Sequence, residues 1–179
     1  ATQYAIQVAK DNGCLISFDP NLRLSLWKTP EEARRRILYG MKQCDIMKIS
    51  EEEVAFVSEQ ESLEKGVSFI RDNSDIKILF VTLGNKGSIA YYKDEKIYCG
   101  GIHQEHVVDT TGAGDTFCGA VLSRILELGT DALTEKDIRE MLLFANAAAS
   151  IVVTRKGALC SMPEPEEIRA ASSLIDKVL

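Results

Sequence analysis

Four consecutive residues, Gly112-Ala113-Gly114-Asp115, are the part of this sequence best suited to chemistry on an anion. They stand between a predicted strand over 105–108 and a predicted helix that Gly129 ends. Small residues let neighbouring backbone N–H groups turn toward one anion, and a helix N-terminus adds about half a positive charge. The segment therefore predicts a phosphate-binding turn beside an ionised carboxylate. The alternative is that the glycines only shape a tight turn and Asp115 only occupies the first turn of a helix.

Two familiar phosphate-binding motifs are excluded by inspection. A dinucleotide fingerprint needs a third glycine where Phe117 stands, and a P-loop needs a Gly-Lys-Ser/Thr sequence that the chain does not contain. A Rossmann dehydrogenase, the default interpretation of an α/β sequence, is therefore disfavoured.

The segment 109–117, Asp-Thr-Thr-Gly-Ala-Gly-Asp-Thr-Phe, resembles the C-terminal signature of the PfkB/ribokinase family of carbohydrate kinases. Further segments agree with that family in the same order along the chain: 48–53, 81–87, 144–149 and 153–158. Together the matches span about residues 14–163, and the segments 18–23 and 50–53 resemble the fructokinase branch.

The resemblance implies a ribokinase-like α/β fold, with a mostly parallel sheet flanked by helices and a hairpin at one edge. It implies that residues 1–179 are the C-terminal nucleotide-binding and catalytic portion of a single such domain. The family's N-terminal part, with its sugar-binding residues and lid, would be missing. That would leave an open sheet edge, covered by the missing portion or by another copy of the chain in a homo-oligomer.

For the reaction, the resemblance implies ATP as phosphoryl donor and a sugar hydroxyl as acceptor. Asp115 matches the family's catalytic base, while Gly112, Ala113 and Gly114 match the anion hole for the transferring phosphoryl group.

The resemblance also implies nucleotide contacts. Thr82, Gly84 and Gly87 match positions that line the nucleotide, and a turn at the end of a strand is the alternative. Asn146 matches a position near the base, although an asparagine in an alanine-rich helix can instead bind a neighbouring helix. Glu53 matches a glutamate that acts on Mg²⁺ through water, with Ser50 in place of the family's asparagine. Ser50 and Glu53 also form a capping box, and the two roles can coexist.

Two weaker sets of candidates remain. The loop residues Asp19, Asn21 and Arg23 either reach the phosphates or Mg²⁺ from the end of a strand or form a structural turn. A further set matches positions that hold a monovalent cation such as K⁺, mostly through backbone carbonyls: Asp109, Thr111, Val152, Arg155, Gly157 and Ser161.

The elements that must position these residues can be predicted from local signals. Helices are expected over 1–12, 30–43, 51–58, 62–72, 116–128 and 135–153, with a last one from Pro163 to the terminus. Strands are expected over 14–19, 45–49, 76–82 and 105–108, with a hairpin over 88–98. Strands alternating with helices indicate an α/β protein with a mostly parallel sheet.

Composition excludes several other classes of function. Lys and Arg total 21 against 27 Asp and Glu, and a net charge of −6 argues against a nucleic-acid or anionic-membrane surface. No apolar run approaches the roughly 18 to 20 residues of a membrane span. Five widely spaced cysteines without a Cys-x-x-Cys pair are typical of a reduced cytoplasm. His103 and His106 lack further ligands for zinc and are expected in a loop.

These observations predict an ATP- and Mg²⁺-dependent sugar kinase with fructose as the first candidate acceptor. Two alternatives stay open. One is a nucleotide-binding fragment without catalysis. The other is a kinase of the same fold for a ketodeoxy sugar acid, a nucleoside or a pyrimidine precursor.

Overall fold

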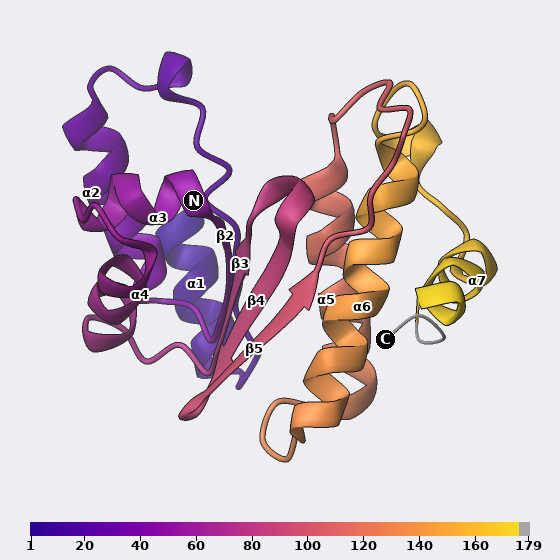
Figure 1. Ribbon diagram of the computed structural model, residues 1–179. Coiled ribbons are helices and arrows are strands. Elements are labelled where there is room, and N and C mark those ends of the chain that lie inside the picture. The colour runs from indigo at the N-terminus through magenta and orange to yellow at the C-terminus, as the bar shows by residue number, and fades with distance from the viewer. Residues whose placement is uncertain (176–179) are drawn as a thin grey trace. The chain divides into compact units, whose positions relative to one another are not determined.

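The computed structural model describes the backbone of residues 1–175 and the side chains of residues 1–172. Strands and helices alternate along the chain (Figure 1). The residues form two compact units, the first from residues 1–81 with 91–93, and the second from residues 82–90 with the chain from Asp94 onward.

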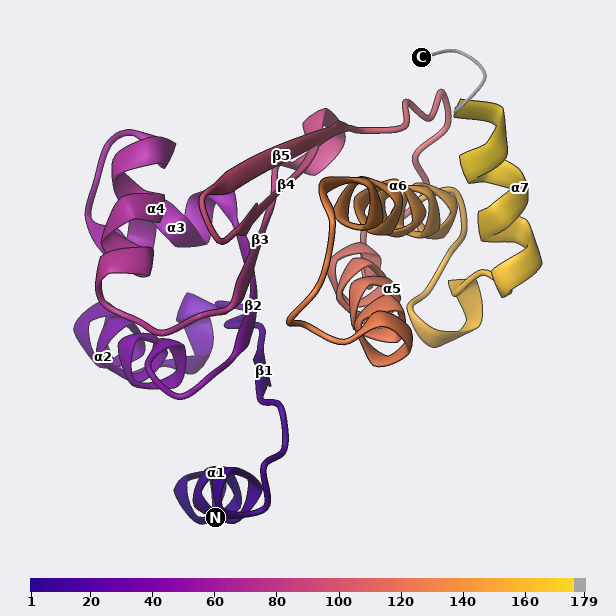
Figure 2. The ribbon, with the colours of Figure 1, turned by 90° about the horizontal axis from the view of Figure 1, so that it is seen from below.

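The first unit carries three strands with helices α2, α3 and α4 along one side of them (Figures 1 and 2). Its strands β2 and β3 are almost wholly buried, as expected for strands covered by helices. The elements are α1 (Thr2–Asp11), β1 (Ser17–Phe18), the 3₁₀ turn η1 (Leu24–Leu26), α2 (Pro30–Met41), β2 (Ile46–Ser50), α3 (Glu51–Ser58), α4 (Leu63–Asp72) and β3 (Ile78–Thr82).

The predicted starts of α2 and α3 are confirmed together with their caps. The Thr29 hydroxyl accepts a hydrogen bond from the Glu32 N–H at 3.1 Å, and Pro30 is the first helical residue. Thr29 supplies an acceptor and Pro30 a fixed backbone angle at a helix start that lacks internal partners, so the helix begins where its sequence signals place it. The predicted helix over 1–12 is also confirmed as α1, which buries none of its residues.

The second unit is built around two long helices that lie side by side (Figures 1 and 2). Thr134 caps α6 in a reciprocal capping box with Asp137. Ala145, Ala147 and Ala148 of α6 are completely buried, which confirms the expected close contact of its small residues. The elements are the 3₁₀ turn η2 (Gly84–Lys86), α5 (Ala113–Leu128), α6 (Glu135–Val152), the 3₁₀ turn η3 (Leu159–Ser161) and α7 (Pro165–Ile175).

The strands form one sheet in the order β1-β2-β3-β4-β5, with β4 (Gly87–Tyr92) and β5 (Glu95–Gly100) joined by a two-residue turn. β1 pairs with β2 in parallel, with Ser17 opposite Ile46. The α/β class, the mostly parallel sheet and the hairpin at one edge are therefore confirmed. In the described sheet β1 and β5 are the edge strands, and a partner for β1 stays a prediction.

Three local predictions are wrong or only partly right. Residues 105–108 form no strand, because the N–H groups of Val108 and Asp109 bind the carbonyl of Val153 at the end of α6. The first strand is shorter than predicted, although the Ile16 carbonyl still accepts from Asp45 and Ile46. Leu128, expected in the core with the rest of its helix face, is 41% exposed because α5 ends there.

The last helix begins near its predicted start and is described as far as Ile175, so the end of that prediction, residues 176–179, lies outside the described residues. Within the described part of the chain, no helix combines the length and apolarity that a bilayer crossing requires.

Candidate functional site

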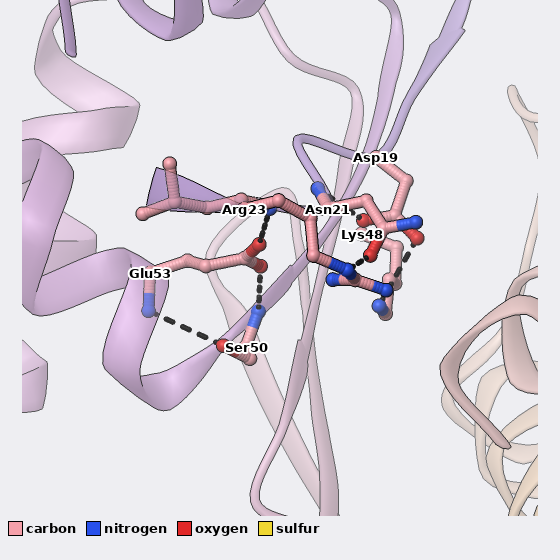
Figure 3. Close-up of polar contacts among 7 residues, drawn as sticks. Asp19, Asn21, Arg23, Lys48, Ser50 and Glu53 are labelled. Atoms are coloured by element: carbon pink, nitrogen blue, oxygen red, sulfur yellow. Dashed lines mark hydrogen bonds and ion pairs between the residues drawn. The ribbon is translucent and has the colours of Figure 1, made fainter. Parts of the chain in front are cut away.

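In the first unit, Glu53 joins the start of α3 to the loop that follows β1 (Figure 3). Its Oε2 accepts a hydrogen bond from the Ser50 N–H at 2.9 Å, and the Ser50 hydroxyl accepts one from the Glu53 N–H at 3.2 Å. Its Oε1 accepts a third from the Leu22 N–H at 2.6 Å. The predicted capping box is therefore confirmed, and the same buried carboxylate also fixes a loop 31 residues away in sequence.

A chain of polar contacts runs through that loop (Figure 3). The Lys48 ammonium lies 3.0 Å from Oδ2 of Asp19, and Oδ1 of Asp19 accepts from the Asn21 N–H at 3.2 Å. The Asn21 side-chain oxygen accepts from Nη1 of Arg23 at 2.7 Å. Asn21 adopts a left-handed φ of 44°, a conformation that asparagine tolerates better than most residues. Side chains thus organise the loop, and the hydrogen bond to Asn21 holds the Arg23 guanidinium in place.

Lys48 is the functional candidate that sequence reasoning missed. Its side chain is 9% exposed and that of its partner Asp19 is 16% exposed. Burial raises the pKa of the Asp19 carboxyl, and the charge and hydrogen bond of Lys48 offset that rise only in part. One signal was available, because Lys48 is the single charged residue of strand β2 and stands between apolar neighbours, Met47 and Ile49.

In the second unit, Gly112-Ala113-Gly114-Asp115 forms the start of α5. Gly112 is the N-cap with a left-handed φ of 83°, and a Cβ at that position would lie 3.4 Å from Ala158. The first N–H groups of an α-helix have no partner inside the helix. Here the Ala113 N–H donates to the Thr110 carbonyl at 3.3 Å, before the helix, and the N–H groups of Gly114 and Asp115 follow it. The Asp115 side chain belongs to this first turn and is exposed. A carboxylate and several N–H donors therefore occur together at one helix N-terminus.

The loop before α5 is tied to the loop after α6 by one carboxylate. Oδ1 of Asp109 accepts from the Thr111 N–H at 2.9 Å, and Oδ2 accepts from the Gly157 N–H at 3.2 Å. These bonds, led by the Thr111 contacts, lower the pKa of Asp109. The fully buried Ser161 hydroxyl closes the second loop, because it lies 2.5 Å from the carbonyl oxygen of Gly157 and 2.7 Å from that of Ala158.

Arg155 holds this second loop to the last helix. Its guanidinium donates to the Ser161 carbonyl at 3.4 Å and pairs with the Glu167 carboxylate of α7. The carbonyl oxygen of the buried Val152 accepts a hydrogen bond from the Arg155 N–H at 3.0 Å. Of the six residues predicted to surround a monovalent cation, Asp109 and Thr111 thus lie in the loop before α5, and the other four lie between the last residue of α6 and η3. Asp109 connects the two segments.

The predicted nucleotide-lining residues lie along the turn from β3 to β4: Thr82 ends β3, Gly84 begins η2 and Gly87 begins β4. Gly84 and Gly87 both have positive φ, 61° and 109°, so the turn needs glycine at both positions. The Leu83 N–H donates to the Gly87 carbonyl at 2.8 Å, which closes the loop.

Asn146 lies in the middle of α6, only 7% exposed, and its amide binds protein atoms. Its Nδ2 donates to the carbonyls of Cys99 and Gly100 at the end of β5, both at 3.2 Å, and its Oδ1 accepts from the Ser88 hydroxyl at 3.0 Å. The predicted contact with a nucleotide base stays a prediction.

The structure thus gathers the predicted residues into separate groups. Ser50 and Glu53 lie with the loop of Asp19 in the first unit. Asp109 and Thr111 lie with Gly157 in the second unit, and Asn146 lies with the hairpin. Among residues 1–172 there is no group of three His, Cys, Asp or Glu side chains placed to hold a metal ion.

The sequence pattern of the family described as "pfkB family carbohydrate kinase" matches residues 1–165. The chain belongs to the pfkB family of carbohydrate kinases. Among its curated relatives is fructokinase-1 of Oryza sativa subsp. japonica, 42% identical over 166 residues, which cover 92% of this chain and 50% of that protein. Another is the Arabidopsis thaliana protein described as "Probable fructokinase-4", 39% identical over 93% of this chain and 51% of its own length. The chain spans about half the length of the curated relatives it matches.

Solved structures agree with this family. A fructokinase double mutant from Vibrio cholerae O395, determined with fructose, ADP and a potassium ion, superposes with a TM-score of 0.86 at 33% identity. The match covers 94% of this chain and 54% of that one. A structure from E. coli described as a ribokinase II, in complex with ATP and Mg²⁺, has a TM-score of 0.81 at 31% identity over 97% of this chain and 53% of its own. The ribokinase-like fold expected from the sequence is therefore confirmed.

Proposed function

We propose that the protein transfers the γ-phosphate of ATP to a hydroxyl of a sugar, with fructose as the preferred acceptor and Asp115 as the base. The observation that carries the proposal is the exposed Asp115 carboxylate in the first turn of α5, next to N–H groups that the helix leaves without partners. The fructokinases among its relatives support the choice of acceptor.

The chemistry needs one proton acceptor and one site for negative charge. Asp115 accepts the proton of the sugar hydroxyl as its oxygen forms a bond to the γ-phosphorus. The bond from that phosphorus to the bridging oxygen of the β-phosphate breaks, and ADP leaves. The N–H groups at the positive end of α5 stabilise the charge on the phosphoryl oxygens during transfer. The Gly114 N–H does so directly, while that of Ala113 also donates to the Thr110 carbonyl at 3.3 Å.

The groups around Glu53 suit a Mg²⁺ ion that arrives with the nucleotide. Each carboxylate oxygen of Glu53 accepts one backbone N–H and keeps a second lone pair, so an indirect contact through water is compatible with its bonds. Mg²⁺ is usually bound through one or two carboxylates, several waters and the substrate phosphates. When bound, the ion neutralises charge on the phosphates. Ser50 and Glu53 keep the loop of Arg23 in place.

The loops around Asp109 suit a monovalent cation. The oxygen atoms offered as ligands are those of the Asp109 carboxylate and of carbonyls such as those of Gly157 and Ser161, which are held in place by the bonds described above. Hard oxygen ligands are those that alkali cations accept. A bound K⁺ would add positive charge near the N-terminus of α5.

The first experiment measures ADP formation from Mg-ATP by the purified protein over a panel of acceptors, with fructose first and K⁺ present. Fructose-dependent ADP formation is the expected result. ADP formation only with a ketodeoxy sugar acid, a nucleoside or a pyrimidine precursor would instead identify a kinase of the same fold for that acceptor. ADP binding without transfer to any acceptor would contradict the proposal and leave a nucleotide-binding protein without catalysis.

The variant Asp115→Asn tests the role of the base. Asparagine keeps the size of the side chain but cannot accept the proton at neutral pH, so kcat should fall by about 10²- to 10⁴-fold. Calorimetric ADP binding should stay unchanged. Asp94→Asn, in the exposed turn between β4 and β5, is the matched control and should keep full turnover. Near-normal turnover of the Asp115 variant would refute the assignment.

A further inference from the structure

We infer that Glu167 of α7 is a positioning residue for the turn 109–115: through Arg155 it holds the loop 155–161, and that loop supports the turn. The inference deepens the proposed function, because its consequence for turnover rests on Asp115 as the base. All the groups involved belong to the second unit.

The Glu167 carboxylate serves two partners. Its Oε2 accepts a hydrogen bond from the Glu164 N–H at 2.9 Å, just before the first residue of α7, and the carboxylate also pairs with the Arg155 guanidinium. The hydrogen bond from Arg155, followed by that from Glu164, lowers the pKa of Glu167, so the group is charged at neutral pH. The start of α7 and the position of Arg155 therefore depend on one side chain.

Arg155 carries this hold to the far end of the loop 155–161. Its Nη1 donates to the Ser161 carbonyl at 3.4 Å, while its backbone N–H donates to the Val152 carbonyl at the end of α6. Inside the loop, the oxygen of the buried Ser161 hydroxyl lies 2.5 Å from the Gly157 carbonyl oxygen. The first and last residues of the loop are thus joined by the guanidinium that α7 holds.

The loop and the turn touch at two points. The Gly157 N–H donates to Oδ2 of Asp109 at 3.2 Å. A Cβ on Gly112 would lie 3.4 Å from both Cα and Cβ of Ala158, so the two backbones pass close to each other. Gly112 has a left-handed φ of 83°, and a glycine turn has much conformational freedom that contacts from outside must restrict. Displacement of the loop therefore loosens the turn that carries Asp115.

The pair between α7 and the loop is exposed, and this sets the size of its effect. The side chains of Arg155 and Glu167 are 36% and 43% exposed. Ion pairs of this kind change an equilibrium constant by about two- to fivefold, so removing one loosens the loop without unfolding the protein. The turn stabilises charge that develops in the transition state. The loss should therefore fall on kcat and leave the KM for ATP and the KM for sugar unchanged.

The test compares Glu167→Gln with the matched control Glu166→Gln. The first change keeps an oxygen for the Glu164 N–H and removes the charge that pairs with Arg155. Glu166 is the neighbouring exposed carboxylate of α7, and its ion pair joins it to Arg169 of the same helix at 3.5 Å. Arg155→Gln and the double variant of Arg155 and Glu167 complete the series.

Two readouts separate the holding of the turn from turnover. Hydrogen exchange of the Thr111 and Gly157 N–H groups, both bonded to Asp109, reports how firmly the loop and the turn are joined, and it needs no ligand. Steady-state kinetics give kcat, the KM for ATP and the KM for sugar. Melting temperatures show whether each variant is folded.

We expect Glu167→Gln and Arg155→Gln to speed the exchange of both N–H groups about two- to fivefold and to lower kcat by a similar factor. Both KM values and the melting temperature should stay close to those of the wild type, and Glu166→Gln should match the wild type throughout. Because both residues act through one contact, the double variant should be no worse than Arg155→Gln.

Wild-type exchange in Glu167→Gln would overturn the inference, and so would equally fast exchange in Glu166→Gln or additive losses in the double variant. Faster exchange with wild-type kcat would overturn the consequence for turnover. If Arg155→Gln fails to fold, Glu167→Gln decides alone. A wild type that transfers phosphate to no acceptor refutes the proposed kinase, while the exchange series still tests whether Glu167 holds the turn.

Discussion

Asp109 shows how much one side chain can organise near a reactive turn. Its two carboxylate oxygens each accept a backbone N–H, one from Thr111 and one from Gly157, which is 48 residues further along the chain. The turn that leads to Gly112 and the loop after α6 are therefore joined by a single charged group. A carboxylate accepts such bonds better than its protonated form, which is the cause of its lowered pKa.

This lowered pKa predicts a dependence of stability on pH. A carboxyl whose folded-state pKa is depressed contributes stability that is fully present above the ordinary Asp pKa and is lost as pH falls through the folded value. Asp109→Asn should therefore lower the free energy of unfolding at neutral pH and reduce its loss in that acid window. Urea unfolding of the wild type and the variant at neutral and acid pH measures both. Parallel pH profiles for the two proteins would contradict the prediction.

At the scale of elements, the loop between β1 and η1 depends on strand β2. Lys48 connects β2 to that loop through Asp19, while Glu53 of α3 holds the loop at Leu22. Burial raises the pKa of Asp19 by more than Lys48 lowers it. The ion pair therefore fixes the position of the loop more than it stabilises the fold.

Removing one partner of this pair should still be costly. Lys48→Met leaves the Asp19 carboxylate buried without its cation, and we expect the free energy of unfolding to fall by about 3–5 kcal/mol. The double variant Lys48→Met with Asp19→Asn should recover part of that loss, because no buried charge remains. Chemical denaturation of the single and double variants checks this. A double variant less stable than Lys48→Met would show that the pair does not behave as a unit.

The turn η2 between β3 and β4 permits a paired test of two glycines. Gly84→Ala places a Cβ in open space, so only its left-handed φ is strained, at about 1–2 kcal/mol. Gly87→Ala also pushes a Cβ against the Cys99 backbone carbonyl, which cannot move aside like a side chain, so its loss of stability should be clearly larger. Thermal melting compares the two. Equal losses would indicate that 85–87 and 99–101 are not in contact in solution.

At the scale of the whole molecule, the net charge of −6 opposes a polyphosphate ligand. In the described part of the second unit, positive potential at the start of α5 comes from the helix N-terminus itself rather than from an excess of basic residues. The proposed function therefore requires a cation that accompanies the nucleotide.

Removal of Mg²⁺ should accordingly stop the reaction without unfolding the protein. An excess of chelator should abolish sugar-dependent ADP formation, and added Mg²⁺ should restore it, while the melting temperature without nucleotide stays the same. The described residues contain no preformed cluster of three metal ligands whose loss would loosen the fold. A large fall in the melting temperature with chelator alone would contradict this expectation.

The sequence by itself determined those features that depend on neighbours in the chain. Thr29 with Pro30, Ser50 with Glu53, and Thr134 in front of α6 each mark a helix start through contacts within four residues. The Gly-Ala-Gly-Asp turn was recognisable for the same reason, since a left-handed glycine followed by a helix is a local event. Short-range signals of this kind also sufficed for the α/β class and the hairpin.

Tertiary structure alone decided where distant groups meet. The second oxygen of Glu53 reaches Leu22, and Asn146 binds Ser88 and Cys99, which are 58 and 47 residues away. The segment 105–108 has the composition of a strand, but its N–H at Val108 finds the free carbonyl at the end of α6 instead. Periodicity and capping patterns describe only residues that are close in sequence, so they cannot predict such partners. A buried hydrogen-bonding group pairs with the group that packing brings within reach, and that group can be distant in sequence.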